Sequence, residues 1–299
     1  MSVGGCVMRE MVCICLVILA MNALAGEDLF GHLKLAEPLP QGAWEVYQVA
    51  TQRRDKGTGQ YTAINTISEF EYGTTDRLTL SFGLAGQGIE TSGLRVDGYL
   101  PGDNEYGFKS SGVELNLAYN ILAPARDAMG LSYVIRLEKL WLDPHSGFDK
   151  DSLSLTTGVN LQKYVFEGQL IWAGNLALEA TKATRRELEG LPDDFEWPTF
   201  AEVELEFTAR TGMSYRFVPK WFLSIEGEFQ QEYETEVNLE RESIFVGPSV
   251  HYGGKNMWFT FSYLGQVSGR GETYDGQPDG YHLIEKTKHE LIAKIGINL

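Results

Sequence analysis

The chain has 299 residues, of which 43% are hydrophobic, and a formal net charge of −16 at pH 7. This length accommodates one large β domain or two domains of ordinary size. The excess of acidic residues argues against nucleic acids and anionic surfaces as partners, because both carry the same sign of charge.

The N-terminus has the pattern of an export signal. Arg9 precedes the apolar run Met11–Ala20, and Ala23–Ala25 has the small-x-small form that signal peptidase cleaves. This run is shorter than the about 20 apolar residues that a membrane-spanning helix needs. We therefore predict a signal peptide, residues 1–25, cleaved near Ala25; a retained N-terminal anchor is the alternative. The segment contains all three cysteines of the chain, Cys6, Cys13 and Cys15.

Residues 26–43 form a predicted lead-in to the main domain. They include Pro38 and Pro40, neither of which can continue a helix or a central strand. From Trp44 to the end, strand patterns alternate with turn patterns, and helical periodicity is scarce. No later stretch has the length of an apolar transmembrane helix, so a membrane-spanning form of residues 44–299 would have to be a closed β-barrel.

The period-two pattern predicts about twelve strands, an even number that is typical of bacterial outer-membrane barrels. The predicted strands are Trp44–Arg53, Tyr61–Tyr72, Arg77–Ile89, Ser110–Leu122, Leu131–Leu142, Ser152–Phe166, Gln169–Thr181, Phe200–Phe217, Trp221–Val237, Glu242–Tyr252, Met257–Ser268 and Lys286–Leu299.

The predicted connections alternate in length. The short turns are Gly73–Asp76, Ala123–Gly130, Glu167–Gly168, Val218–Lys220 and Gly253–Asn256. The longer loops are Gly88–Lys109, Asp143–Asp151, Lys182–Thr199 and Gly269–Glu285, and the connections near Asp55–Gly59 and Asn238–Arg241 are short exceptions. Short turns at one rim and long loops at the other are typical of outer-membrane barrels, in which the long loops face out of the cell.

The hairpin in residues 199–237 shows the two faces of these strands most clearly. On its first arm, Val203, Leu205 and Phe207 alternate with Glu202, Glu204 and Glu206. Alternation alone does not say which face is inside, because a soluble exported β-sandwich has the same period with its apolar face inward. However, the strands are long and one-sided, and an apolar lumen of about twelve strands would be too wide for side chains to fill.

We therefore predict an all-β fold, a transmembrane antiparallel up-and-down β-barrel, with its apolar face toward lipid. The last residues, Leu291–Leu299, support this fold because they form an amphipathic strand at the end of the chain. The expected location is the outer membrane of a Gram-negative cell, and a soluble exported β protein is the alternative.

Residues after the signal segment resemble the opening of a family of outer-membrane β-barrels of unknown function. The resemblance rests on Asp28–Gly31, Ala36–Pro40 and Gly42–Glu45, and beyond them the likeness is one of architecture. The resemblance implies outer-membrane lipids and the barrel-assembly machinery as partners, and it carries no catalytic residues. Such barrels usually end in an aromatic residue that this machinery reads, whereas this chain ends in Leu299.

With the apolar face outward, the lumen wall is acidic. We expect Arg210 to lie near Glu228 across the turn, and Glu204 and Glu206 to face residues 230–234. The predicted lumen and selectivity residues are Glu202, Glu204, Glu206, Glu226, Glu228, Arg210, Arg136 and Glu114. The alternative is that Arg136 and Arg210 tie these carboxylates into a structural plug.

The functional hypothesis is a narrow, passive, monomeric channel for small cationic or neutral polar solutes, because carboxylates favour cations. The alternatives are a hydrolase at the extracellular rim and a closed structural or adhesive barrel. His145 and Ser146 point opposite ways on an extended chain, so they make a poor base–nucleophile pair, and we expect a solvated loop histidine. No catalytic residue, cofactor or metal site is predicted, since Asp275–Gly276 and Asp279–Gly280 are ordinary turn sequences.

Overall fold

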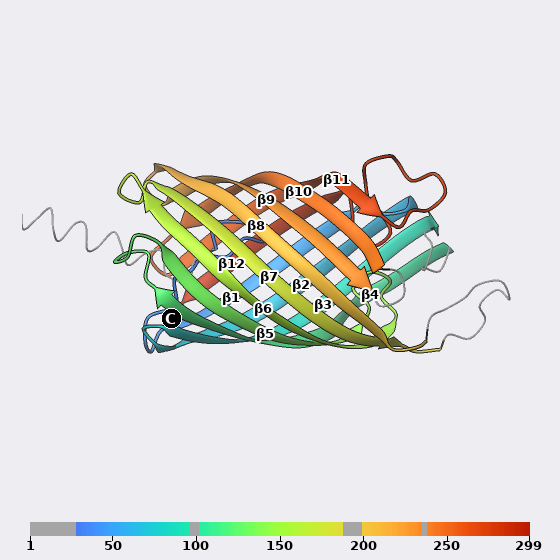
Figure 1. The fold of residues 1–299 in the computed structure, drawn as a ribbon, viewed down its shortest axis with the longest axis horizontal. Coiled ribbons are helices and arrows are strands. Elements are labelled where there is room, and N and C mark those ends of the chain that lie inside the picture. The colour runs from blue at the N-terminus through green and yellow to red at the C-terminus, as the bar shows by residue number, and fades with distance from the viewer. Residues whose placement is uncertain (1–27, 96–101, 188–198, 235–237) are drawn as a thin grey trace, which may run out of the picture.

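The computed structural model of the protein describes residues 28–95, 102–187, 199–234 and 238–299. Twelve antiparallel strands form one closed barrel, in which sequence neighbours pair and β1 pairs with β12 (Figure 1). The strands are β1 (Trp44–Arg54), β2 (Thr58–Thr75), β3 (Leu78–Arg95), β4 (Gly102–Leu122), β5 (Gly130–Leu142), β6 (Asp149–Val165), β7 (Leu170–Arg185), β8 (Glu202–Val218), β9 (Trp221–Glu234), β10 (Asn238–Gly253), β11 (Met257–Gly271) and β12 (His289–Asn298). The predicted all-β up-and-down barrel is confirmed.

The two ends of the barrel differ in their connections. The turns β2–β3, β6–β7, β8–β9 and β10–β11 are short and lie at the end that carries the C-terminus, on the left of Figure 1. We call this the short-turn end and the opposite one the long-loop end. The predicted signal peptide and its cleavage site near Ala25 lie outside the described residues. Within the described residues, no helix has both the length and the apolar character needed to cross a membrane.

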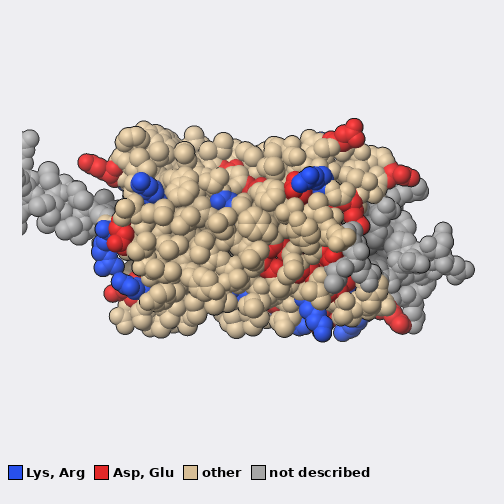
Figure 2. All heavy atoms as spheres, viewed as in Figure 1, with Lys and Arg blue, Asp and Glu red and all other residues tan. Residues whose placement is uncertain are grey.

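Alternate side chains of each strand face opposite ways, and the apolar set faces outward. Leu205 and Leu223 are 55% and 56% exposed, whereas the inward Glu226 is 2% exposed. Most of the outer wall is uncharged in the view of Figure 2. A wall that shows leucine to its surroundings and encloses glutamate is suited to lipid outside and a polar lumen inside. The predicted orientation is confirmed.

Two predicted loops are largely strand. The predicted loop Gly88–Lys109 is wrong over most of its length, because β3 continues to Arg95 and β4 begins at Gly102, with Ile89 opposite Tyr106. Likewise, the predicted connection Asn238–Arg241 belongs to β10. These segments are polar, and the first is also rich in glycine, so their sequence resembles that of a loop. In a closed wall, however, backbone hydrogen bonds to the neighbouring strands keep them in strand conformation.

Candidate functional site

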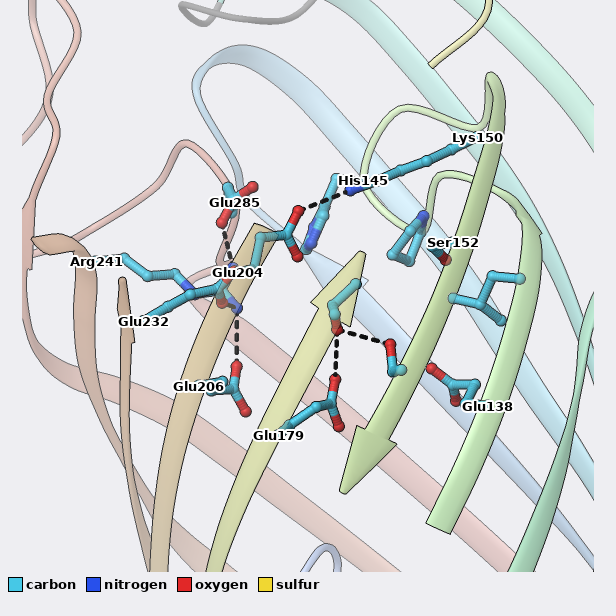
Figure 3. Close-up of a pocket in the computed structure, with 14 residues that line it drawn as sticks. Glu138, His145, Lys150, Ser152, Glu179, Glu204, Glu206, Glu232, Arg241 and Glu285 are labelled. Atoms are coloured by element: carbon cyan, nitrogen blue, oxygen red, sulfur yellow. Dashed lines mark hydrogen bonds and ion pairs between the residues drawn. The ribbon is translucent and has the colours of Figure 1, made fainter. Parts of the chain in front are cut away.

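The barrel encloses a polar cavity toward its long-loop end, with a volume of about 170 Å³. Side chains from β5 to β10 line it, together with residues of the loops 143–148 and 272–288 (Figure 3). We call it the long-loop cavity. Its six glutamates are Glu138, Glu179, Glu204, Glu206, Glu232 and Glu285. With one lysine and one arginine, and with its histidine neutral, the lining has a formal charge of −4.

Arg241, at the start of β10, ties the walls of this cavity together. Its side chain is 6% exposed and makes ion pairs with Glu206 (2.8 Å), Glu232 and Glu285. Glu285 reaches in from the loop 272–288. Burial alone would raise the pKa of the Glu285 carboxyl, but Arg241 and Lys150 lower it to about 2. The guanidinium therefore holds that loop against the barrel wall.

Three carboxylates beside Arg241 are close enough to share a cation. Oxygens of Glu232, Glu240 and Glu285 lie within 4.8 Å of one another. The guanidinium of Arg241 already contacts two of these carboxylates, so a fixed positive charge stands beside the position that a metal ion would take.

Five of the six glutamates that the sequence predicts for selectivity lie on the lumen side of β8 and β9, and basic side chains pair with four of these five. The ion pairs are Glu202–Arg185, Glu204–Lys150 (3.3 Å), Glu206–Arg241 (2.8 Å) and Glu228–Arg210. The predicted contact between Arg210 and Glu228 is confirmed, as is the placement of Glu204 and Glu206 opposite residues 232–234. The partners from β6, β7 and β10 were not predicted. A selectivity role for these residues stays a prediction.

The other two predicted lumen residues lie farther round the wall. Arg136 on β5 pairs with Glu179 on β7 at 2.7 Å. Glu114 on β4 is 4% exposed and accepts a hydrogen bond from Asn116 Nδ2 at 3.1 Å. Within the described residues, neither forms a hydrogen bond or ion pair with the β8–β9 glutamates, so the structure divides the predicted set into separate clusters along the wall.

The prediction that His145 is a solvated loop histidine is wrong. The loop 143–148 folds inward because the Asp143 carboxylate accepts the backbone N–H groups of His145 (2.7 Å) and Ser146 (3.2 Å). His145 Nδ1 is buried and has no hydrogen-bond partner among the described residues. Burial lowers the pKa of His145 well below its usual value, and Lys56 and Arg53 add to this effect. The ring is therefore neutral, and Ser146 makes no bond to it that would create a nucleophile.

Residues 28–39 fill the lumen at the short-turn end, which the sequence did not predict. We call residues 28–39 the N-terminal plug. Its best-defined contact is with Glu226 on β9, whose carboxylate accepts the consecutive N–H groups of Gly31, His32 (3.0 Å) and Leu33 (3.0 Å). Successive backbone N–H groups that converge on one carboxylate form an anion-binding nest. Glu226 is thus an attachment point for the plug.

Other polar contacts connect the plug to several strands around the wall. Asp28 pairs with Lys294 on β12 at 2.9 Å and with Lys34 of the plug at 2.6 Å. Asn175 on β7 accepts the N–H of Lys34 and donates to its carbonyl oxygen, both at 2.8 Å. Asn120 on β4 donates to the carbonyl oxygen of Ala36 at 2.9 Å. The plug therefore spans the lumen and contacts opposite sides of it.

Apolar side chains also fix the plug. Leu29, Phe30 and Leu33 are fully buried against Ile171 and Phe222 of the wall. The sequence does contain a signal for this contact: the adjacent apolar residues Leu29 and Phe30 lie outside every predicted strand, so they need another apolar surface to pack against. On the wall, the lumen-facing Ile171, Ala173 and Phe222 form a complementary apolar patch for it.

We expect the docking of the plug to depend on pH through His32. Burial alone would lower the pKa of His32, but Glu228 and Glu290 raise it above its usual value, against an opposing effect of Arg210. His32 Nε2 lies 2.7 Å from Glu290. The stabilisation by a raised pKa is complete at acidic pH and is lost as pH rises through the pKa of the docked state. Docking should therefore weaken toward alkaline pH.

Trypsin can measure this weakening, because a protease cannot enter a narrow lumen and must wait for Lys34 to leave it. Between about pH 6 and about pH 9, we expect cleavage after Lys34 to accelerate more in the native protein than in His32→Gln, which does not titrate there. The His32→Gln variant corrects for the pH dependence of trypsin itself. Identical pH profiles would contradict a role of His32 in docking.

Comparisons with known proteins agree on the fold. A protein family described as "Family of unknown function (DUF6662)" matches residues 22–299. The chain is similar to the COG4313 outer membrane channel from Pseudomonas putida F1, with 15% identity and a TM-score of 0.61 over 88% of this chain and 98% of that chain. It is also similar to the β domain of the Bordetella autotransporter BrkA, with 9% identity and a TM-score of 0.57 over 87% of this chain and 100% of that chain. No curated protein matches the sequence. The fold is therefore that of outer-membrane β-barrels.

Proposed function

The chain belongs to the family of unknown function DUF6662, which confirms the resemblance of its N-terminal residues, and we propose that it is an outer-membrane channel. The proposed solutes are small and cationic, or neutral and polar. The observation that carries this proposal is the polar long-loop cavity inside a closed barrel, with a formal lining charge of −4. The similarity in fold to an outer membrane channel supports it. We further propose that the mature chain, without residues 1–25, works as a monomer in outer-membrane lipid.

The long-loop cavity provides a site where a cation can exchange its water shell for carboxylate oxygens. Among the lining residues drawn in Figure 3, Glu138 makes no ion pair, whereas Glu204 and Glu206 are paired. An unpaired carboxylate that faces a polar cavity lowers the energy of a cation there and raises that of an anion. Glu138 is therefore the residue that we expect to contribute most to selectivity.

Planar-bilayer recordings of the purified protein test the proposal. We expect small current steps that favour cations, and a cation-to-anion permeability ratio that falls roughly threefold in Glu138→Gln, because a carboxylate across a wet cavity is worth about 0.5–1 kcal/mol. Glu242→Gln is the matched control, since Glu242 lies at the same end and pairs with the exposed Arg270 at 2.7 Å. Complete absence of conductance at every voltage and pH tested would contradict the channel proposal and favour a closed structural barrel.

A further inference from the structure

We propose that the N-terminal plug, residues 28–39, is a gate, and that the Glu226 carboxylate holds it closed. This inference rests on the proposed channel function, because a gate requires a path to close. The plug occupies the short-turn half of the lumen, and the long-loop cavity lies toward the other end. Both use the same wall strand: Glu232 lines the cavity, and Glu226 lies roughly 20 Å farther along β9. Departure of the plug would join the cavity to the short-turn end.

The way the plug is attached allows it to leave while the barrel stays closed. Among residues 28–39, no backbone–backbone hydrogen bond to the wall is present in the described structure, and the polar contacts run between wall side chains and plug backbone or side chains. Meanwhile β1 is paired along its length with both β2 and β12. Removal of the plug therefore breaks no bond of the strand ladder.

The C-terminal end of the plug has a fixed pivot. Gly42 has a positive φ of 82°, its N–H donates to the carbonyl oxygen of Gly73 at 2.7 Å, and the N–H of Gly73 donates back to Ala43 at 3.0 Å. Gly73 also lies tightly against Pro40, because a Cβ on Gly73 would overlap the Pro40 carbonyl oxygen. The chain is thus anchored to β2 at residues 40–43, and the segment before this anchor is held by side chains.

Glu226 is the wall residue that accepts the most hydrogen bonds from the plug. Three consecutive N–H groups depend on its two oxygens, and Ser249 Oγ donates to it at 3.3 Å. No basic side chain pairs with Glu226 in the described structure, so its charge is balanced by the plug backbone. When the plug leaves, water must replace these donors, and that exchange is possible in a polar lumen.

The first test alters this contact in the full-length mature protein. In planar bilayers, Glu226→Gln should increase the open probability roughly tenfold, because hydrogen bonds to a charged acceptor are the stronger kind. Trypsin cleavage after Lys34 should accelerate by a similar factor, which reports release of the plug independently of conductance. Glu242→Gln, a glutamate far from the plug, should change neither quantity.

The second test locks the plug in place. A Cβ on Gly31 would lie 3.2 Å from the Ser262 Cβ, slightly less than the about 3.5–4.5 Å that a disulfide spans, so a small shift of the plug backbone is needed. Its other near atoms are the movable ends of Glu226 and Ile292. The described residues contain no cysteine. In Gly31→Cys/Ser262→Cys, oxidation should reduce the open probability at least roughly tenfold relative to the reduced protein, and a reductant should restore it.

The results separate the gate from the channel. Equal open probability in the oxidised and reduced double variant, with conductance present, would overturn the gate and leave the channel standing. Release of the plug on reduction, shown by cleavage after Lys34, without any current would overturn the channel. If Glu226→Gln fails to fold, the disulfide pair alone decides the matter.

Discussion

Arg241→Met should destabilise the barrel by about 3–5 kcal/mol, because it leaves three buried carboxylates facing one another without their cation. The three partners come from β8, β9 and the loop 272–288, namely Glu206, Glu232 and Glu285. Methionine preserves most of the side-chain volume, so the loss reports charge and hydrogen bonding. The free energy of unfolding in detergent micelles, from denaturant titration followed by tryptophan fluorescence, measures it.

The control is Arg270→Met, which removes an arginine from the same end of the barrel. Arg270 pairs with Glu242 at 2.7 Å, but its side chain is 66% exposed, so water replaces the lost contact and stability should hardly change. Combining Arg241→Met with Glu232→Gln and Glu285→Gln should recover part of the loss, because the repulsion disappears. Equal destabilisation by the two arginine substitutions would contradict a central role for Arg241.

The wall of the barrel is predictable because the information is local to each strand. Leu205 and Glu206 are neighbours that must face lipid and lumen, and every strand repeats this requirement at period two. The contact of Arg210 with Glu228 follows from the same reasoning, since a short turn fixes the register of a hairpin. At the long-loop end, the predicted β3, β4 and β10 stop short of the observed strands, because glycine and polar residues there resemble a loop but still pair with the neighbouring strand.

The interior is not predictable in this way, because its contacts join residues that are far apart in sequence. Glu226 meets Gly31 across 195 positions, and Arg241 meets Glu285 across 44. Any inward arginine could in principle neutralise any inward glutamate. The period-two pattern therefore predicts which side of the wall a side chain faces, but not which residue it pairs with. His145 illustrates the same limit: its loop turns inward through Asp143, and the sequence of that loop resembles a solvated one.

Phe30→Ala should release the N-terminal plug while leaving the barrel wall almost as stable as before. Phe30 is fully buried against Ile171 and Phe222, and a Cβ on Gly212 would come within 2.9 Å of its ring. Truncation of a buried phenylalanine costs about 3–5 kcal/mol, and this cost falls on docking because Phe30 contacts the wall only when the plug is in the lumen. Cleavage after Lys34 should therefore accelerate at least roughly 100-fold, the factor that corresponds to the lower value.

The matched control for this substitution is Phe207→Ala on the lipid face of β8. Phe207 packs edge-on against Phe229 with ring centroids 6.3 Å apart, outside the lumen and away from the plug. Its loss should reduce the free energy of unfolding of the barrel and leave cleavage after Lys34 unchanged. The two phenylalanines thus report two separate equilibria, docking of the plug and folding of the wall. If Phe30→Ala instead lowered the unfolding free energy by the same amount and cleavage stayed slow, the plug would be a structural part of the folded barrel that leaves only on unfolding, and a gate in this position would be impossible.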